Sequence, residues 1–165
     1  MLKADHPLGP FIPHSKGEVT PKDWECLDGT LYLSPQGKPY IVFCHEHTQI
    51  IDGTICYAPL SDDLTEASGE PVTLFKASEP EWANKNPAEN EHFVTDGPFM
   101  YRTKTGELLM LWSSFILGQY AECLVKFKDG TLQLTYHTPN KSGFEHPQFV
   151  PIEDMGTHLQ LHKNQ

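Results

Sequence analysis

Residues 95–114 read TDGPFMYRTKTGELLMLWSS. An acidic residue and a glycine lead into an apolar run, a polar turn containing Gly106 follows, and a second apolar run ends in Ser113 and Ser114. Two apolar runs joined by a glycine-containing turn are typical of a β-hairpin. The sequence therefore predicts a hairpin whose first strand begins with the carboxylate of Asp96.

The same pattern occurs twice more along the chain. An earlier copy reads LDGTLYL over residues 27–33, turns at SPQG, and returns as KPYIVFCH over residues 38–45. A weaker copy reads CLVKF over residues 123–127, turns at KDG, and returns as TLQLTYH over residues 131–137. Self-similar supersecondary units of this kind indicate a repeat architecture.

Composition favours a single all-β domain. The chain has 165 residues, of which 38% are hydrophobic, and its apolar runs are short and broken by 12 Gly and 14 Pro. After the first hairpin the pattern predicts two more strands, at residues 54–60 and 71–76. Four strands joined by tight turns form an antiparallel meander of the size of one propeller blade.

Spacing limits how many blades the chain holds. Gly37 and Gly106 are 69 residues apart, whereas Gly106 and Gly130 are only 24 apart, too few for four strands and their turns. We therefore expect one partial β-propeller domain over residues 1–165, with about two to three four-stranded blades. Its predicted parts are an extended arm (1–24), a complete blade (25–77), a shortened blade (92–125), and a closing hairpin with the tail (126–162).

Charge and hydropathy exclude several classes of partner. The formal net charge of −10 argues against nucleic acid and against an anionic membrane surface. No run reaches the roughly 18 apolar residues of a membrane span, and the N-terminus lacks an apolar signal-peptide core. These features predict a cytoplasmic protein, or a secreted one if a leader was lost. The four cysteines stand singly, which favours buried free thiols.

The repeated aspartates are the first candidates for chemistry. In a propeller the first strand of each blade lines a central channel, so Asp28 and Asp96 are expected to reach one polar mouth. Paired carboxylates at a funnel suit glycoside hydrolysis, in which one group protonates the leaving oxygen and another activates water. The alternative is local: Asp-Gly is a common turn dipeptide, and Asp accepts backbone hydrogen bonds at strand starts.

The residues around these aspartates carry a wider resemblance. The motifs lie in order along nearly the whole chain: LDGTLY (27–32), VFCHE (42–46), DGTI (52–55), LSDDL (60–64), VTDGPF (94–99), LMLWSSF (109–115) and HTPN (137–140). Together they resemble the later blades of glycoside hydrolase family 43. The resemblance implies a five-bladed β-propeller glycosidase that hydrolyses O-glycosidic bonds in arabinose- and xylose-containing glycans, with carbohydrate as its partner.

The resemblance also implies roles for three carboxylates in an inverting reaction. Asp28 matches the Asp that orients and tunes the acid, and Asp96 stands where the family has a Glu general acid. Asp is shorter than Glu by one methylene, about 1.5 Å of reach. Glu46 is therefore a candidate replacement for the acid, or else a rim residue that binds sugar hydroxyls.

Two parts of the family pattern have no counterpart here. Nothing before residue 25 resembles the blade that carries the general base, and Ala121-Glu122 stands where the family places a His that faces a central metal, often calcium. We expect no required cofactor, no protein metal ligands, and at most a structural calcium in the channel. An isolated chain is expected to be a poor enzyme, and the alternative is a non-catalytic carbohydrate-binding or vestigial propeller fragment.

Three further residues are predicted to contact sugar. His45 and His137 end strands at the expected channel mouth, where each either binds substrate or is a hydrogen-bonded rim histidine. Trp24, in the loop before Asp28, is the candidate stacking platform. Because two to three blades leave strand edges unpaired, we also expect a homo-oligomer that completes the ring.

Overall fold

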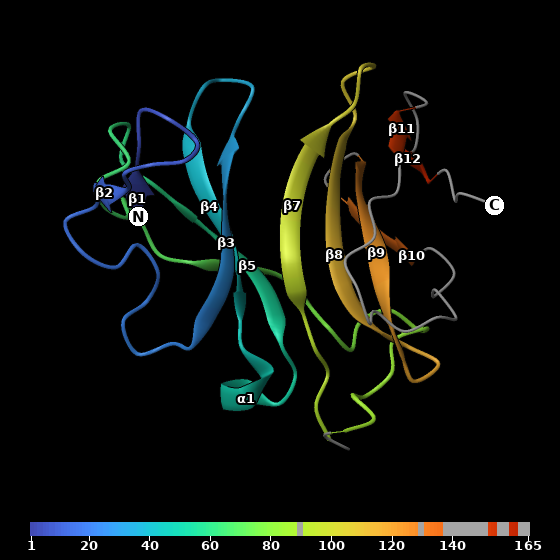
Figure 1. Ribbon diagram of the computed structural model, residues 1–165. Helices are drawn as coiled ribbons and strands as arrows, with labels where there is room; N and C mark the ends of the chain where they lie inside the picture. The colour runs from blue at the N-terminus through green and yellow to red at the C-terminus, as the bar shows by residue number, and fades with distance from the viewer. Residues whose placement is uncertain (89–90, 129–130, 137–151, 155–158, 162–165) are drawn as a thin grey trace.

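Two four-stranded antiparallel sheets make up most of the molecule (Figure 1). The computed structural model describes residues 1–88, 91–128, 131–136, 152–154 and 159–161. The first sheet has the order β3 (Cys26–Leu33), β4 (Pro39–His45), β5 (Thr54–Pro59) and β6 (Val72–Lys76). The second contains β7 (Asp96–Arg102), β8 (Leu108–Ile116), β9 (Gln119–Lys128) and β10 (Thr131–Tyr136), also paired in chain order.

The remaining elements are short. β1 (Leu2–Lys3) pairs with β2 (Ile12–Pro13), and β11 (Ile152–Asp154) pairs with β12 (Leu159–Leu161). A single turn of helix, α1 (His47–Ile50), follows β4. None of the helical structure in the described residues is long or apolar enough to cross a membrane.

The predicted all-β class and partial β-propeller of four-stranded blades are confirmed. The expected break between a shortened second blade and a third hairpin does not occur. β9 is one strand of ten residues that pairs with β8 along one edge and with β10 along the other. The glycine spacing misled because one long strand serves both hairpins, so the third copy of the pattern is the outer half of the second sheet.

The two sheets share one apolar core. Val42, Cys44, Ile55 and Phe75 of the first sheet pack with residues of β8 and β9 in the second. Trp112 is fully buried at this junction, with its ring centroid 4.9 Å from that of Phe75. Since burial of large aromatic side chains dominates core energetics, this contact fixes the two blades relative to each other.

The arm before β3 covers the other face of the first sheet. Val19 is buried against Phe43 and Cys56, and Met1 and Trp24 pack at the edge of the same cluster. One side of this blade is therefore covered by the chain's own N-terminal segment.

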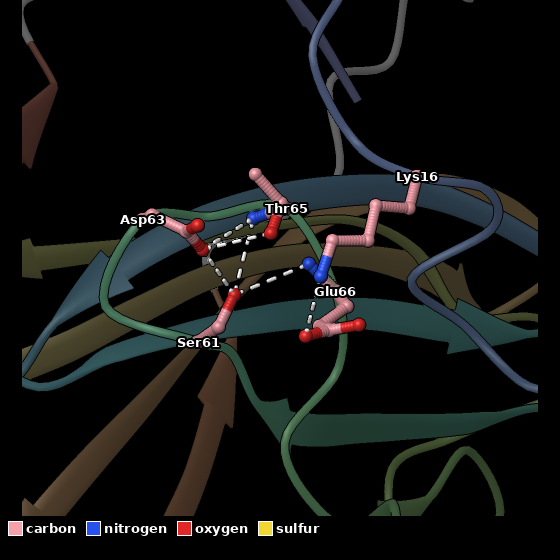
Figure 2. Close-up of polar contacts among 5 residues, drawn as sticks. All are labelled: Lys16, Ser61, Asp63, Thr65 and Glu66. Carbon is pink, nitrogen blue, oxygen red and sulfur yellow. Dashed lines mark hydrogen bonds and ion pairs between the residues drawn. The ribbon is translucent and has the colours of Figure 1, made fainter.

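Polar contacts fasten the arm to the turn between β5 and β6, as Figure 2 shows. Asp63 accepts hydrogen bonds from the Ser61 hydroxyl (2.7 Å) and from the Thr65 hydroxyl (2.8 Å) and amide (3.2 Å). The Lys16 ammonium lies 2.9 Å from the Glu66 carboxylate. The hydrogen bonds from Ser61 and Thr65 lower the pKa of Asp63 to about 2. Both the turn and the arm are thus held by exposed polar groups, which water screens.

Cysteine chemistry agrees with the prediction of free thiols. None of the four cysteines, Cys26, Cys44, Cys56 and Cys123, is in a disulfide, and the last three are buried.

Candidate active site

Strands β3 and β7, the innermost strands of the two sheets, lie side by side (Figure 1). Each contains an irregularity near its start, between Leu27 and Thr30 in β3 and between Asp96 and Phe99 in β7. Bulges bend a strand and re-aim its side chains, and they are common beside active sites. Both irregularities lie near the starts of strands that contact each other.

The strand pairings show that the equivalent positions of β3 and β7 lie one residue away from the repeated aspartates. Asp28 has a φ of 55° and Gly97 a φ of 56°. In β3, the last pair before the irregularity is Leu27 with Cys44 of β4. In β7, the last pair before the irregularity is Asp96 with Ser113 of β8, so Leu27 corresponds to Asp96. Asp28 therefore corresponds to Gly97, and the prediction that Asp28 and Asp96 hold equivalent positions is wrong. Aligning the two Asp-Gly dipeptides gives a repeat that is one residue shorter than the 69 residues between the turn glycines Gly37 and Gly106.

The offset lets Asp28 bind the neighbouring blade. Its Oδ2 accepts a hydrogen bond from the Gly97 amide at 2.8 Å. Two residues further along β3, the Thr30 hydroxyl donates to the Pro98 carbonyl at 2.8 Å. Asp28 thus fixes the backbone immediately after Asp96, and the two aspartates are neighbours across the two strands.

Asp96 is held from a third strand. The Tyr120 hydroxyl on β9 donates to Asp96 Oδ2 at 2.6 Å. Burial, followed by the hydrogen bond and charge of Asp96, raises the pKa of Tyr120, so the phenol stays protonated and acts as the donor. Nothing in the sequence singled out Tyr120; its only local signal is its place at the start of a strand.

Glu46 is the buried carboxylate of the group. It follows β4 and precedes α1, and the residue is only 7% exposed. Its Oε1 forms no hydrogen bond with the described groups, while Oε2 lies 3.6 Å from His47 Nδ1. Burial raises the pKa of Glu46, and the negative charge of Asp96 raises it further, against the opposing effect of His47. A carboxyl group in such an environment retains its proton to higher pH, as a general acid requires.

Trp24 and His45 lie against each other. Their ring centroids are 4.0 Å apart and the planes differ by 10°, so the rings are stacked. His45 Nε2 also lies 2.7 Å from Gln49 Oε1, and the residue is 9% exposed. One face of the Trp24 ring is therefore covered by His45, and the residue is partly buried against the core of the first sheet. His137 lies outside the described residues.

Metal ligation finds no support in this part of the chain. Among the described residues, no group of three or more His, Cys, Asp or Glu side chains is arranged to hold a metal ion. Within the described residues these side chains form no such ligand set for the structural calcium that the resemblance suggests, and the chemistry proposed below uses protein groups alone.

A cavity of about 400 Å³ lies away from these carboxylates. Lys38, Tyr40, Pro59 and Asp62 are among the residues that line it, at the start of β4 and the end of β5. Because Glu46 follows the other end of β4, the cavity and the three carboxylates lie at opposite ends of the blade. We place the candidate site at the carboxylates, where the charges converge.

The chain resembles several solved structures. The chain is similar to an endo-arabinase from Bacteroides thetaiotaomicron, with 36% sequence identity and a TM-score of 0.76, over 97% of this chain and 58% of that protein. It also shares its fold with a thermostable family-43 glycoside hydrolase (21% identity, TM-score 0.63, 84% of this chain and 45% of that one). An α-L-arabinofuranosidase from Clostridium thermocellum matches at 14% identity and a TM-score of 0.57, over 94% of this chain and 50% of that one.

The chain therefore spans little more than half the length of the endo-arabinase and about half or less of the other two. None of the curated proteins compared with it gives a significant match. The family model for glycosyl hydrolases family 43 matches residues 1–127, a range that contains Asp28, Glu46 and Asp96. By that match, the chain belongs to glycosyl hydrolases family 43.

Proposed function

We propose that this protein hydrolyses O-glycosidic bonds in arabinose- or xylose-containing glycans by inverting acid/base catalysis. The observation that carries the proposal is the grouping of three carboxylates: Asp28 on β3, Asp96 on β7, and Glu46 between β4 and α1. The charges of Asp28 and Asp96 both act on Glu46 and both raise its pKa, after the larger effect of burial. A carboxyl group whose pKa is raised by burial and by neighbouring carboxylates is the arrangement that glycoside hydrolysis uses.

Glu46, Asp28 and Trp24 each have a role in this proposal. No described carboxylate is assigned as the general base, so the attacking water releases its proton to solvent and turnover is slow. Glu46 protonates the leaving oxygen, since its carboxyl group is the one whose pKa is raised. Asp28 orients the site by fixing the backbone after Asp96. Trp24, stacked on His45 and partly buried, is the proposed aromatic contact for a sugar ring. The similarity to an endo-arabinase makes a linear arabinan the first substrate to test.

A second copy is proposed to complete the ring of blades. The innermost strands expose large apolar side chains: Leu27, Leu31 and Leu33 on β3 and Phe99 on β7 are each at least 50% exposed. Exposed apolar residues grouped in this way are typical of an interaction surface. Light scattering on the purified chain should give the mass of a dimer or larger species, whereas a stable monomer at all concentrations contradicts this part of the proposal.

The experiment for catalysis uses the full chain with aryl arabinofuranosides, aryl xylosides and linear arabinan. Turnover with inverted anomeric configuration, followed by NMR, is the expected result. Glu46→Gln should lower kcat by about 10²- to 10⁴-fold, the usual contribution of a general acid. Asp62→Asn is the matched control, because Asp62 is an exposed carboxylate at the far end of the blade, paired with Lys38.

A different outcome would favour the second candidate. Glycan binding without turnover, unchanged by Glu46→Gln, would overturn the proposed catalysis and support a non-catalytic carbohydrate-binding role. The stacked Trp24 and His45 would be the contacts to test in that case, and Trp24→Ala should weaken binding.

A further inference from the structure

We propose that Tyr120 is a positioning residue that holds Asp96 as a hydrogen-bond acceptor at the mouth, so that proton donation falls to Glu46. The hydrogen bond itself is independent of the reaction, but its catalytic consequence rests on the function proposed above. Asp96 stands where the family resemblance places the general acid. Tyr120 is therefore the residue that decides between the two candidate acids.

The reach of the tyrosine is the first step of the argument. β7 and β9 lie on either side of β8, so their backbones are two strand spacings apart, roughly 10 Å. A phenol is long enough to extend across β8 and meet a short side chain from β7. The contact is 2.6 Å from the Tyr120 oxygen to Asp96 Oδ2. This length is typical of a hydroxyl that donates to an ionised carboxylate.

Packing fixes the ring that carries the donor. Tyr120 is paired directly opposite Phe115 in the sheet, and the two rings meet edge to face with centroids 5.4 Å apart. Edge-to-face aromatic contacts hold a ring in a preferred orientation. The hydroxyl is thus presented to Asp96 by a side chain that has little freedom to turn away.

The backbone of Asp96 is fixed from the opposite side. Asp28 Oδ2 accepts from the amide of Gly97, the next residue along β7. Asp96 is therefore held at its carboxylate by Tyr120 and at its backbone by Asp28. Asp96 Oδ2 already accepts a hydrogen bond from Tyr120. The Asp96 carboxylate is therefore arranged to accept hydrogen bonds, including one from a sugar hydroxyl, and this opposes its use as a proton donor.

Glu46 contrasts with Asp96 at each of these points. It is buried, its Oε1 accepts no hydrogen bond from the described residues, and the charge of Asp96 acts on it. An ionised Asp96 therefore favours the protonated form of Glu46. By keeping Asp96 as an acceptor, Tyr120 supports the proton on Glu46 without touching it.

The experiment follows the ionisation of Tyr120 directly. The chain, whose six tyrosines are labelled with ¹³C at Cζ, is titrated by NMR through alkaline pH, and the Tyr120 signal is assigned by its loss in Tyr120→Phe. Tyr120 should stay protonated at a pH where an ordinary tyrosine, with a pKa of about 10, is half ionised. Asp96→Asn should let Tyr120 ionise at lower pH. If Tyr120 titrates like the other tyrosines and ignores Asp96→Asn, the proposal is overturned.

Kinetics test the catalytic consequence. Tyr120→Phe keeps the ring and deletes the hydroxyl, and it should lower kcat roughly 10- to 100-fold with little change in KM, as for a lost hydrogen bond to a charged group. Tyr32→Phe is the matched control, since the Tyr32 hydroxyl on β3 accepts from Arg102 at the far end of β7 at 3.0 Å, away from the carboxylates. An equal loss of Tm in both variants with unchanged kcat would make Tyr120 merely structural. If the wild-type chain shows no turnover, the proposed function fails, and the titration alone decides the role of Tyr120.

Discussion

Replacing Glu46 with glutamine should stabilise the folded chain at neutral pH. The Glu46 side chain is 8% exposed, and its Oε1 accepts no hydrogen bond from the described residues. A buried acceptor left unsatisfied costs about 1–3 kcal/mol, and more when it is charged. Glutamine keeps the shape and removes the charge, so we expect a gain of about 1–2 kcal/mol, part of that cost. For a chain of this size the gain corresponds to roughly 2–8 °C in Tm.

The gain should depend on pH in a defined direction. Burial, and then the charge of Asp96, raises the pKa of Glu46 above 4.5. The folded state therefore binds this proton more tightly than the unfolded chain does. Stability from Glu46 is fully present below pH 4.5 and is lost as the pH rises through the raised pKa. Each tenfold change in the ionisation constant corresponds to about 1.4 kcal/mol.

Urea unfolding followed by circular dichroism, at pH values below and above this window, measures the effect. The difference in unfolding free energy between Glu46→Gln and wild type should grow with pH and then level off. Glu70→Gln, at an exposed position, is the control and should differ little from wild type at any pH. A Glu46→Gln variant that is less stable at neutral pH, or whose difference from wild type does not vary with pH, would refute the reasoning.

Three other perturbations test the core, the arm and the bulge. Trp112→Ala should cost about 3–5 kcal/mol in urea unfolding, because Trp112 is fully buried between the sheets; Trp82→Ala, at a partly buried neighbour, should cost less, and equal losses would contradict this account. Asp63→Ala should speed hydrogen exchange at the Thr65 amide, which donates a hydrogen bond to Asp63. In the wild-type chain the same loss of protection should appear as the pH falls from 3.8 towards 2, because Asp63 then becomes protonated. Unchanged exchange would show that the turn does not depend on Asp63. Gly97→Ala should cost about 1–2 kcal/mol from its φ of 56° alone, since an added methyl meets nothing within 4 Å, and an unchanged urea midpoint would show that the bulge relaxes.

A site that is costly to the fold is consistent with function. Active sites commonly retain buried or strained groups that a more stable sequence would lack. Here Glu46 is buried and its Oε1 has no hydrogen-bond partner in the part of the chain that the structure describes, while Asp28 adopts a left-handed φ of 55°. A stabilised Glu46→Gln that has also lost turnover would join the two observations.

The local patterns in the sequence determined the strands. Alternating apolar runs and glycine turns placed β3, β4, β5 and β6 within a residue or two of their observed bounds. Hairpin strands are set by nearby residues, so a local pattern is enough to find them. The order of the motifs also indicated the family, and the family model confirms it.

The tertiary structure decided the site. The strand pairings make Asp28 equivalent to Gly97 rather than to Asp96, one residue away from the alignment that the repeated Asp-Gly dipeptides suggest. No local pattern records which side chains meet across strands far apart in the chain, such as Tyr120 and Asp96. The burial of Glu46 likewise depends on how the end of β4 packs against neighbouring segments. The sequence of residues 95–114 predicts a hairpin that begins with the carboxylate of Asp96. The contacts of that carboxylate are set by the neighbouring strands, which only the tertiary structure places.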